Sequence, residues 1–239
     1  MKLIDAKWEK RNFGYDVTEV DIDNFDTLDI IKDSIDKIKS KYIAVKVPIG
    51  MLDVYKLLSN KGFYFVECLI YCQFNINDIV IEFNNMIKTK SYKAINKDVE
   101  VVLKEIKNGN IFNSDRIYLD SNFSKEISGM RYYNWINDLI FDGNVDIVIT
   151  YFNNELFAFS ILKNNGYGEY NCILWGLMPK YYGKGLGKLL VNNTLDFVKK
   201  NNGKVLLTTI SSNNLAIINC VNKFSFKVAT EKYVFVKHL

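Results

Sequence analysis

The sequence predicts a mixed α/β fold, and three observations lead to this prediction. Short apolar strand patterns alternate with amphipathic helix patterns along the 239 residues, and no internal repeat occurs. The composition, 49% hydrophobic and 24% charged, is that of a globular chain long enough to bury a core without disulfides. Glycine is scarce, with 13 residues, yet four glycines and one of the two prolines fall within residues 176–187. We therefore expect a turn with a special role in that segment.

The first part of the chain is expected to form a small α/β domain over residues 1–97. A strand, a helix and a second strand are predicted in succession, at residues 42–47, 51–60 and 63–74. Gly62 is expected to end the helix. The polar composition of residues 84–98 indicates a linker, so the domain boundary is expected between residues 97 and 98.

The second domain, residues 98–239, is expected to follow the order β-α-β-β-β-α-β-α-β. Its strands are predicted near residues 99–106, 145–151, 155–163, 169–177, 205–210 and 232–237, and its helices near 128–140, 185–201 and 213–224. Asn153 and Asn154 suit the positive φ angles of a tight hairpin. Gly203 is expected to cap the helix that precedes it.

The charge pattern argues against nucleic acid as a partner. The net charge is +4, but the basic residues are 28 Lys and three Arg, interspersed with acidic residues and without long runs of one sign. A mixed, solvated surface explains this pattern better. No signal peptide and no stretch of 18 apolar residues is found, so we expect a cytoplasmic protein that does not enter a membrane.

Cysteine and histidine usage excludes several catalytic classes. The four cysteines lie in apolar runs, which suits free thiols in a reducing compartment. The single histidine, His238, is next to the C-terminus, so neither a metal site nor a Ser–His–Asp or Cys–His mechanism is expected.

The glycine-rich segment follows a predicted strand and opens a predicted helix. Its core is Tyr182-Gly-Lys-Gly-Leu-Gly187. Such a turn exposes backbone N–H groups at a helix N-terminus, where a phosphate can bind, and glycine leaves room for close approach. The segment is neither a Walker loop nor the start of a Rossmann unit. A plain tight turn is the alternative to a ligand site.

A second motif downstream gives the turn its context. After a further strand comes Ser211-Ser-Asn-Asn-Leu-Ala-Ile-Ile-Asn-Cys-Val-Asn-Lys-Phe-Ser-Phe226. The two motifs, in this order and at this spacing, resemble those of the GCN5-related N-acetyltransferase (GNAT) family over about residues 99–239. The resemblance implies a mixed, mostly antiparallel central sheet flanked by helices, and acetyl-CoA as the donor for direct, sequential acetyl transfer to an amine.

The resemblance also assigns residues to the cofactor. The pyrophosphate would lie on the backbone of residues 183–188, and the pantetheine would pair with the strand edge at Trp175 and Leu177. Asn213 would contact the cofactor, although it also reads as a helix N-cap. The residues assigned to acetyl-CoA are Trp175, Leu177, Tyr182, Gly183, Lys184, Gly185, Leu186, Gly187, Lys188 and Asn213.

The chain departs from the family pattern at three positions. Tyr182 replaces the usual Gln or Arg, and Ser225 replaces a Gly. Cys220 stands at the position of the tyrosine that the family commonly uses as general acid. Cys220 and Tyr182 are therefore the candidate catalytic residues. Cys220 as a small core residue is the favoured alternative, in which case the proton would come through water or from Tyr181 or Tyr182.

The acceptor assignment rests on a narrower resemblance. Residues 114–123 and 131–136, with residues 6–14 and 57–67, resemble the dTDP-fucosamine acetyltransferase group, which acetylates an amino group on a nucleotide-linked deoxysugar. Arg116 and Arg131 are then candidates for binding the sugar nucleotide's diphosphate. Trp135, with Tyr132 and Tyr133, would stack on base or sugar, the alternative being helix packing. Glu169 and Asp138 are the carboxylates considered as general base, although an exposed surface role is favoured for each.

Two other functions remain open at this stage. One is a related transferase whose acceptor is a peptide N-terminus or another small amine. The other is a non-catalytic acyl-CoA-binding regulatory module, which the departures at Cys220 and Tyr182 motivate. The oligomeric state is also open, a homodimer included.

Overall fold

The chain folds into two compact units that are interleaved along the sequence. The computed structural model describes residues 1–82 and 84–239. The first unit contains residues 1–70, 211–213 and 230–239, and the second contains residues 71–210 and 214–229. The single boundary expected between residues 97 and 98 therefore differs from this division, since residues 71–97 group with the second unit and the C-terminal residues with the first.

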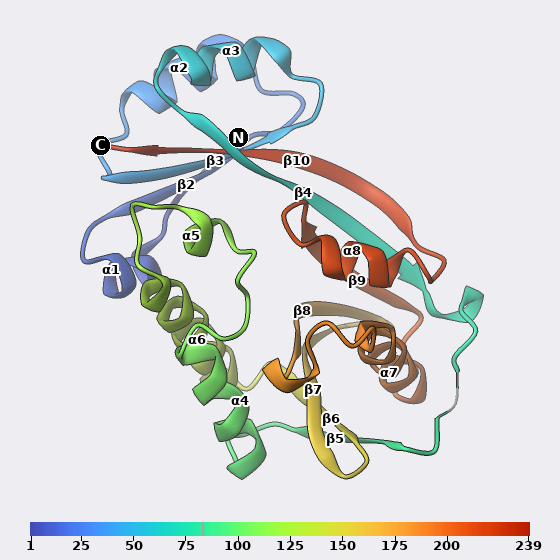
Figure 1. The fold of residues 1–239 in the computed structure, drawn as a ribbon. Helices are drawn as coiled ribbons and strands as arrows, with labels where there is room; N and C mark the ends of the chain where they lie inside the picture. Colours follow the sequence, from blue (N-terminus) through green and yellow to red (C-terminus); the bar gives the residue numbers. More distant parts are fainter. Residues whose placement is uncertain (83) are drawn as a thin grey trace. The chain divides into compact units, whose positions relative to one another are not determined.

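The first unit contains five neighbouring strands with two helices on one face (Figure 1). Its elements are β1 (Lys2–Asp5), α1 (Lys7–Phe13), β2 (Val17–Asp21), α2 (Leu28–Asp36), β3 (Tyr42–Pro48), α3 (Leu52–Asn60), the first half of β4 (Tyr64–Asn75) and most of β10 (Lys227–His238). The strand order is β1-β2-β3-β10-β4. Buried side chains of α2 and α3, including Ile31 and Leu58, pack on strand residues such as Val45. The predicted strand–helix–strand unit around Pro48 and Gly62 is confirmed.

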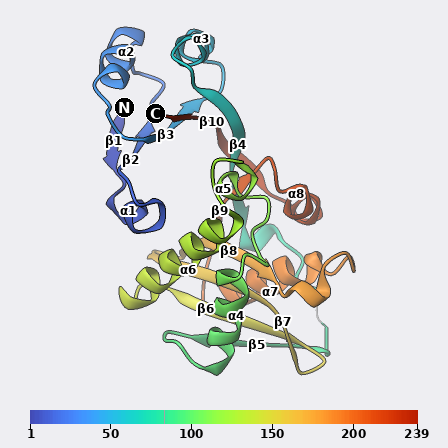
Figure 2. The ribbon, with the colours of Figure 1, turned by 60° about the vertical axis from the view of Figure 1, so that its left-hand side comes forward.

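The second unit has a mostly antiparallel sheet covered by helices on both faces (Figure 2). Its elements are η1 (Ile76–Asp78), β5 (Ile87–Tyr92), α4 (Lys97–Lys107), α5 (Arg116–Leu119), α6 (Lys125–Phe141), β6 (Asp146–Phe152), β7 (Glu155–Gly166), β8 (Glu169–Leu177), η2 (Pro179–Tyr181), α7 (Gly187–Lys200), β9 (Val205–Ser211) and α8 (Leu215–Val221). The pairs β5/β6, β6/β7 and β7/β8 are antiparallel, whereas β8/β9 is parallel. The mixed, mostly antiparallel fold expected from the sequence is confirmed.

Neighbouring residues of β7 show how the two faces are covered. Successive side chains of a strand point to opposite faces. The ring of Phe159 contacts Phe112, in the loop after α4, at 6.2 Å between centroids. The hydroxyl of Ser160 lies 2.6 Å from that of Thr194 on α7. Helix α7 therefore lies on the face opposite to Phe112, and buried residues of α4 and α6 share a core with Phe159.

Two expectations about residues 84–106 were wrong. The strand predicted over residues 99–106 is helix α4, because the side chain of Asn96 caps it by accepting hydrogen bonds from the N–H groups of Asp98 and Val99, at 3.0 and 3.1 Å. Its valines suggested a strand, but the buried residues Val99, Val102, Leu103 and Ile106 follow helical spacing. The polar stretch interpreted as a linker contains strand β5.

The turns in the structure agree more closely with the turns predicted from the sequence. Asn153 and Asn154 have φ angles of 52° and 63°, as a tight hairpin requires. The end of α7 differs by one residue from the prediction. Asn202, with φ of 59°, adopts the left-handed conformation, and Gly203 then donates its N–H to the carbonyl of Val198 at 2.8 Å. Gly203 belongs to the capping motif, but it is not the left-handed residue.

Candidate functional site

Strands β8 and β9 run together for only part of their length. Their parallel ladder joins residues 169–172 of β8 to residues 205–208 of β9. Strand β8 continues to Leu177, which pairs with Ala158 of β7 on its other side. The edge of β8 that faces β9 is therefore open beyond Cys172, at Trp175 and Leu177. An open edge offers main-chain N–H and C=O groups to a ligand that lies along it.

The side chain of Trp175 is fixed by helix α7. Its indole N–H donates to the hydroxyl of Thr194 at 3.0 Å, and this hydroxyl donates to the carbonyl of Leu190, also at 3.0 Å. Because the indole is held in this way, Trp175 is available to a ligand chiefly through its main chain. Gly176 is explained by packing, since a Cβ there would lie 2.2 Å from the ring of Phe159.

The glycine turn leads directly from this edge into helix α7. Gly183 and Gly185 have φ angles of 71° and 70°, which side chains rarely tolerate. A Cβ placed on either glycine would meet nothing within 4 Å. Leu186 precedes the helix as its N-cap residue and makes no side-chain capping hydrogen bond. The turn is therefore open, and the residue before α7 does not cap the first N–H groups of the helix, as an anion-binding helix N-terminus requires.

The other members of the turn have individual roles. Lys184 places its ammonium 5.5 Å from the centre of the Tyr181 ring. Lys188 forms an ion pair with Glu82. Gly187 is required by packing, because a Cβ there would lie 2.4 Å from the sulfur of Cys220. Of the four glycines within residues 176–187, Gly183 and Gly185 keep the turn open, whereas Gly176 and Gly187 permit close packing.

Tyr182 is directed toward the loop after α4. Its hydroxyl donates to the main-chain carbonyl of Asn110 at 3.0 Å. Burial, with a smaller contribution from the negative charge of Glu105, raises the pKa of Tyr182 to about 12. The phenol is therefore protonated at neutral pH and is a possible proton donor, but not a base.

Cys220 is half-buried on α8, against the start of α7. Burial raises the pKa of its thiol, and the charge of Lys223 opposes this only in part. Its sulfur fills the space above Gly187 that a side chain would otherwise take. A protonated thiol in such a contact suits a packing residue, and it is a poor nucleophile.

Asn213 is not the N-cap of α8, contrary to one of the two roles expected for it. The capping residue is Asn214, whose side-chain oxygen accepts from the N–H of Ile217 at 3.2 Å. Asn213 belongs to the first unit, where its side-chain amide donates to the carbonyl of Val66 at 3.2 Å.

The acceptor-side candidates surround a buried carboxylate that the sequence analysis missed. Asp115 caps α5 by accepting from the N–H of Ile117 at 2.9 Å. It also accepts from the hydroxyls of Ser128 and Tyr132, at 3.2 and 3.1 Å. Arg131 Nη1 lies 4.0 Å from Asp115 Oδ1. The sequence signal was available, since an aspartate directly before a short helix is a common N-cap.

Asp115 changes the interpretation of two neighbours. Arg131 faces a carboxylate and the ring of Tyr132, 5.6 Å from its guanidinium carbon, so part of its charge is neutralised within the unit. Burial raises the pKa of Tyr132 well above its ordinary value, and its ring packs on Phe112 at 4.3 Å. Tyr132 is therefore a packing residue. Arg116 begins α5, and Trp135 lies on α6 with its ring 6.2 Å from that of Tyr132.

Glu169 is too distant to be the general base. It is the first residue of β8, whereas the open edge is at the other end of the strand. At about 3.3 Å per residue, Glu169 and Leu177 are roughly 26 Å apart. The carboxylate of Glu169 accepts from the side-chain amide of Asn165 at 2.8 Å, within the hairpin. Asp138 lies on α6, partly buried.

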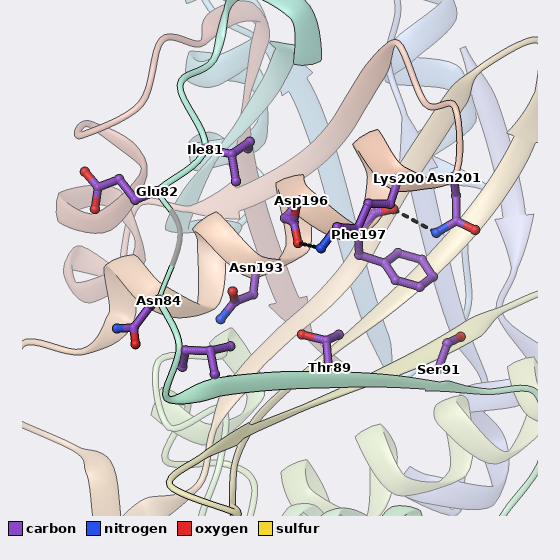
Figure 3. A pocket seen from close by; sticks show the side chains of 11 residues that line it. Ile81, Glu82, Asn84, Thr89, Ser91, Asn193, Asp196, Phe197, Lys200 and Asn201 are labelled. Carbon is purple, nitrogen blue, oxygen red and sulfur yellow. Dashed lines mark hydrogen bonds and ion pairs between the residues drawn. The ribbon is translucent and has the colours of Figure 1, made fainter.

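A pocket of about 230 Å³ lies along α7, between this helix and residues 81–91 (Figure 3). Its lining is mainly polar: Asn84, Thr89, Ser91, Asn193, Asp196, Lys200 and Asn201, with Ile81, Glu82, Ile87 and Phe197. None of these residues belongs to the glycine turn. Over the described residues, no three or more His, Cys, Asp and Glu side chains are grouped to hold a metal ion. None of the described helices is long and apolar enough to cross a membrane.

Comparison with known proteins agrees with this geometry. Residues 111–226 match the family model described as the acetyltransferase (GNAT) family. This chain is therefore similar to the GNAT acetyltransferase family over slightly less than half of its length. The match spans the open edge of β8, the glycine turn and helix α8. The match to this family indicates an acetyl-CoA-dependent N-acetyltransferase.

Solved structures share the fold at low sequence identity. A GCN5-related N-acetyltransferase from Sphaerobacter thermophilus has a TM-score of 0.65 at 8% identity, over 99% of this chain and 75% of that chain. A tandem GNAT protein from the clavulanic acid biosynthesis pathway has a TM-score of 0.56 at 9% identity, over 87% and 67%. A GCN5-related N-acetyltransferase from Kribbella flavida has a TM-score of 0.54 at 11% identity, over 93% and 81%. A search of curated protein sequences finds no match to the chain.

Proposed function

We propose that the chain transfers the acetyl group of acetyl-CoA to the amine of an aminodeoxysugar nucleotide. The observation that supports the donor half is the continuity of the open edge of β8 with the open glycine turn at α7. The pyrophosphate of CoA would lie on the N–H groups of residues 183–188, with Lys184 and Lys188 nearby. The pantetheine would pair with the main chain at Trp175 and Leu177. No Cβ fills the space above Gly183 and Gly185, so the turn fits a phosphate.

The transfer is a direct displacement. The neutral amine of the acceptor attacks the thioester carbonyl and forms the C–N bond, the C–S bond breaks, the CoA thiolate leaves, and the proton lost by the amine nitrogen passes to solvent. The developing oxyanion needs a hydrogen-bond donor, for which a main-chain N–H near Leu177 is the candidate. The thiolate needs a proton, and the phenol of Tyr182, protonated at neutral pH, is the candidate among the residues of the turn.

The acceptor half rests on the sequence resemblance together with two arginines. Arg116 and Arg131 come from neighbouring helices, α5 and α6, and flank Asp115. Both arginines are candidates for binding the diphosphate of a sugar nucleotide. Trp135 is the candidate for stacking on the sugar or base.

Release of the CoA thiol tests this proposal. The full-length chain, supplied with acetyl-CoA, should turn over a dTDP- or UDP-linked aminodeoxysugar at least about 10-fold faster than a peptide N-terminus or a polyamine, measured as kcat/KM. Faster turnover of a peptide or polyamine would contradict the sugar acceptor, while the proposed acetyltransferase activity would stand. Binding of CoA without turnover of any amine would favour the non-catalytic acyl-CoA-binding module.

The role of Cys220 has its own test. Replacement of Cys220 by alanine is expected to leave kcat within about threefold of wild type, because the thiol packs over Gly187 rather than serving as the acid. Cys220→Ser, which keeps a protic group of similar size, is the matched variant. A loss of about 10²-fold or more in the alanine variant, restored by serine, would instead identify Cys220 as the proton donor.

A further inference from the structure

The segment that follows η1 is hydrogen-bonded to α7 through the buried side chain of Asn192. Asn192, only 3% exposed, accepts a hydrogen bond from the N–H of Glu82 at 2.9 Å and donates one to the carbonyl of Glu82 at 2.8 Å. A single amide thus satisfies both main-chain groups of Glu82, as a neighbouring strand would. Glu82 is therefore held beside helix α7 through its main chain, and this placement does not depend on its carboxylate. In Figure 3 the side chain of Glu82 points away from the pocket.

The carboxylate of Glu82 is bound to the lysine that follows the glycine turn. Lys188 is the second residue of α7 and lies one turn before Asn192, on the same face. Its ammonium forms an ion pair with Glu82. Residues 179–188 contain two further lysines and no acidic residue. Glu82 thus brings a negative charge to this turn from a segment 106 residues earlier, while Lys180 at the start of the turn pairs with Glu155 at 2.7 Å.

We propose that Glu82 competes with the phosphates of the ligand for Lys188 and so lowers the affinity of the glycine turn for CoA. This inference rests on the proposed function of the turn. A phosphate at the N-terminus of α7 and the carboxylate of Glu82 are both anions that need the same ammonium, and each repels the other. Ligand binding must therefore draw Lys188 away from Glu82 or place two anions beside one cation. Glu82 acts on ligand affinity through Lys188 and does not touch the reacting atoms.

Neutralising Glu82 should tighten the binding of CoA. Glu82→Gln removes the charge and keeps the size of the side chain, and Asn192 still holds the main chain. We expect the Kd for CoA, measured by calorimetry at low salt, to fall about 3- to 10-fold. Because exposed charges are screened, the gain should shrink as the salt concentration rises.

Two further variants make the test specific. In a Lys188→Gln background, Glu82→Gln should give a clearly smaller gain, because only the direct repulsion between the two anions is then relieved. Asp196→Asn is the matched control for net charge, since Asp196 pairs with Lys200 on the same helix at 2.6 Å, outside the glycine turn. Its Kd for CoA should remain within about twofold of wild type.

Each other outcome contradicts a particular claim. If wild type binds CoA and Glu82→Gln binds it equally or more weakly, the competition is wrong while the proposed function stands. A gain that is just as large without Lys188, or that Asp196→Asn reproduces, also overturns the competition. If neither wild type nor any variant binds CoA, the proposed function itself is overturned, and the role of Glu82 with it.

Discussion

Replacement of Gly129 by alanine is expected to destabilise the second unit by about 1–2 kcal/mol. Gly129 lies in α6, where the helix passes the end of α4. A Cβ on Gly129 would lie 2.7 Å from the carbonyl oxygens of Ile106 and Lys107 and 2.8 Å from the nitrogen of Gly109. These are main-chain atoms, which cannot rotate away, so the helices must separate. Overpacking of this kind costs about 1–3 kcal/mol or more, which exceeds the gain of up to about 1 kcal/mol in helix propensity.

Urea unfolding of the full-length chain measures this effect. Phe141→Ala is the control on the same helix, because Phe141 is 91% exposed and its loss should change the free energy of unfolding by less than about 0.5 kcal/mol. A Gly129→Ala variant as stable as wild type would mean that α4 and α6 do not approach as closely as described. The contact matters for the site, because the loop it supports presents Asn110 to Tyr182 and leads to Asp115.

Local sequence signals predicted those parts of the fold that depend on neighbouring residues. The bounds of β8, residues 169–177, and the hairpin at Asn153 and Asn154 follow from apolar patterning and from the backbone preference of asparagine. The glycine turn was predicted for the same reason. Helix α4 was missed because its valines favour a strand on propensity, while the Asn96 cap and the helical spacing of buried residues favour a helix.

The partners of the charged site residues could not be predicted. Arg131 faces Asp115, and Lys188 faces Glu82, 106 residues earlier in the chain. Such pairs depend on tertiary packing, which the residue pattern within one helix does not reveal. The same limit applies to Gly176 and Gly187, because the sequence does not reveal that Phe159 and Cys220 occupy the space where a side chain would lie.

Replacement of Gly185 by valine is expected to raise the Kd for CoA at least about 10-fold. Gly185 has a φ of 70°, where a β-branched residue is strained. Its missing side chain leaves open the space at the N-terminus of α7, where a phosphate would have to approach the main chain. Valine would both fill this space and tilt the N–H groups of the turn, so about 1.4 kcal/mol or more of binding free energy should be lost.

Strain alone has to be separated from loss of the phosphate site, and the chain contains a matched glycine for this purpose. Gly143 follows α6, has a φ of 68°, and a Cβ there would also meet nothing within 4 Å. Gly143→Val should therefore lower the melting temperature about as much as Gly185→Val and bind CoA like wild type in calorimetry. Equal affinities in two folded variants would contradict the phosphate site. Weak binding confined to Gly185→Val would instead locate the CoA phosphates at this turn. The two glycines share the same backbone strain, but only Gly185 belongs to the glycine turn.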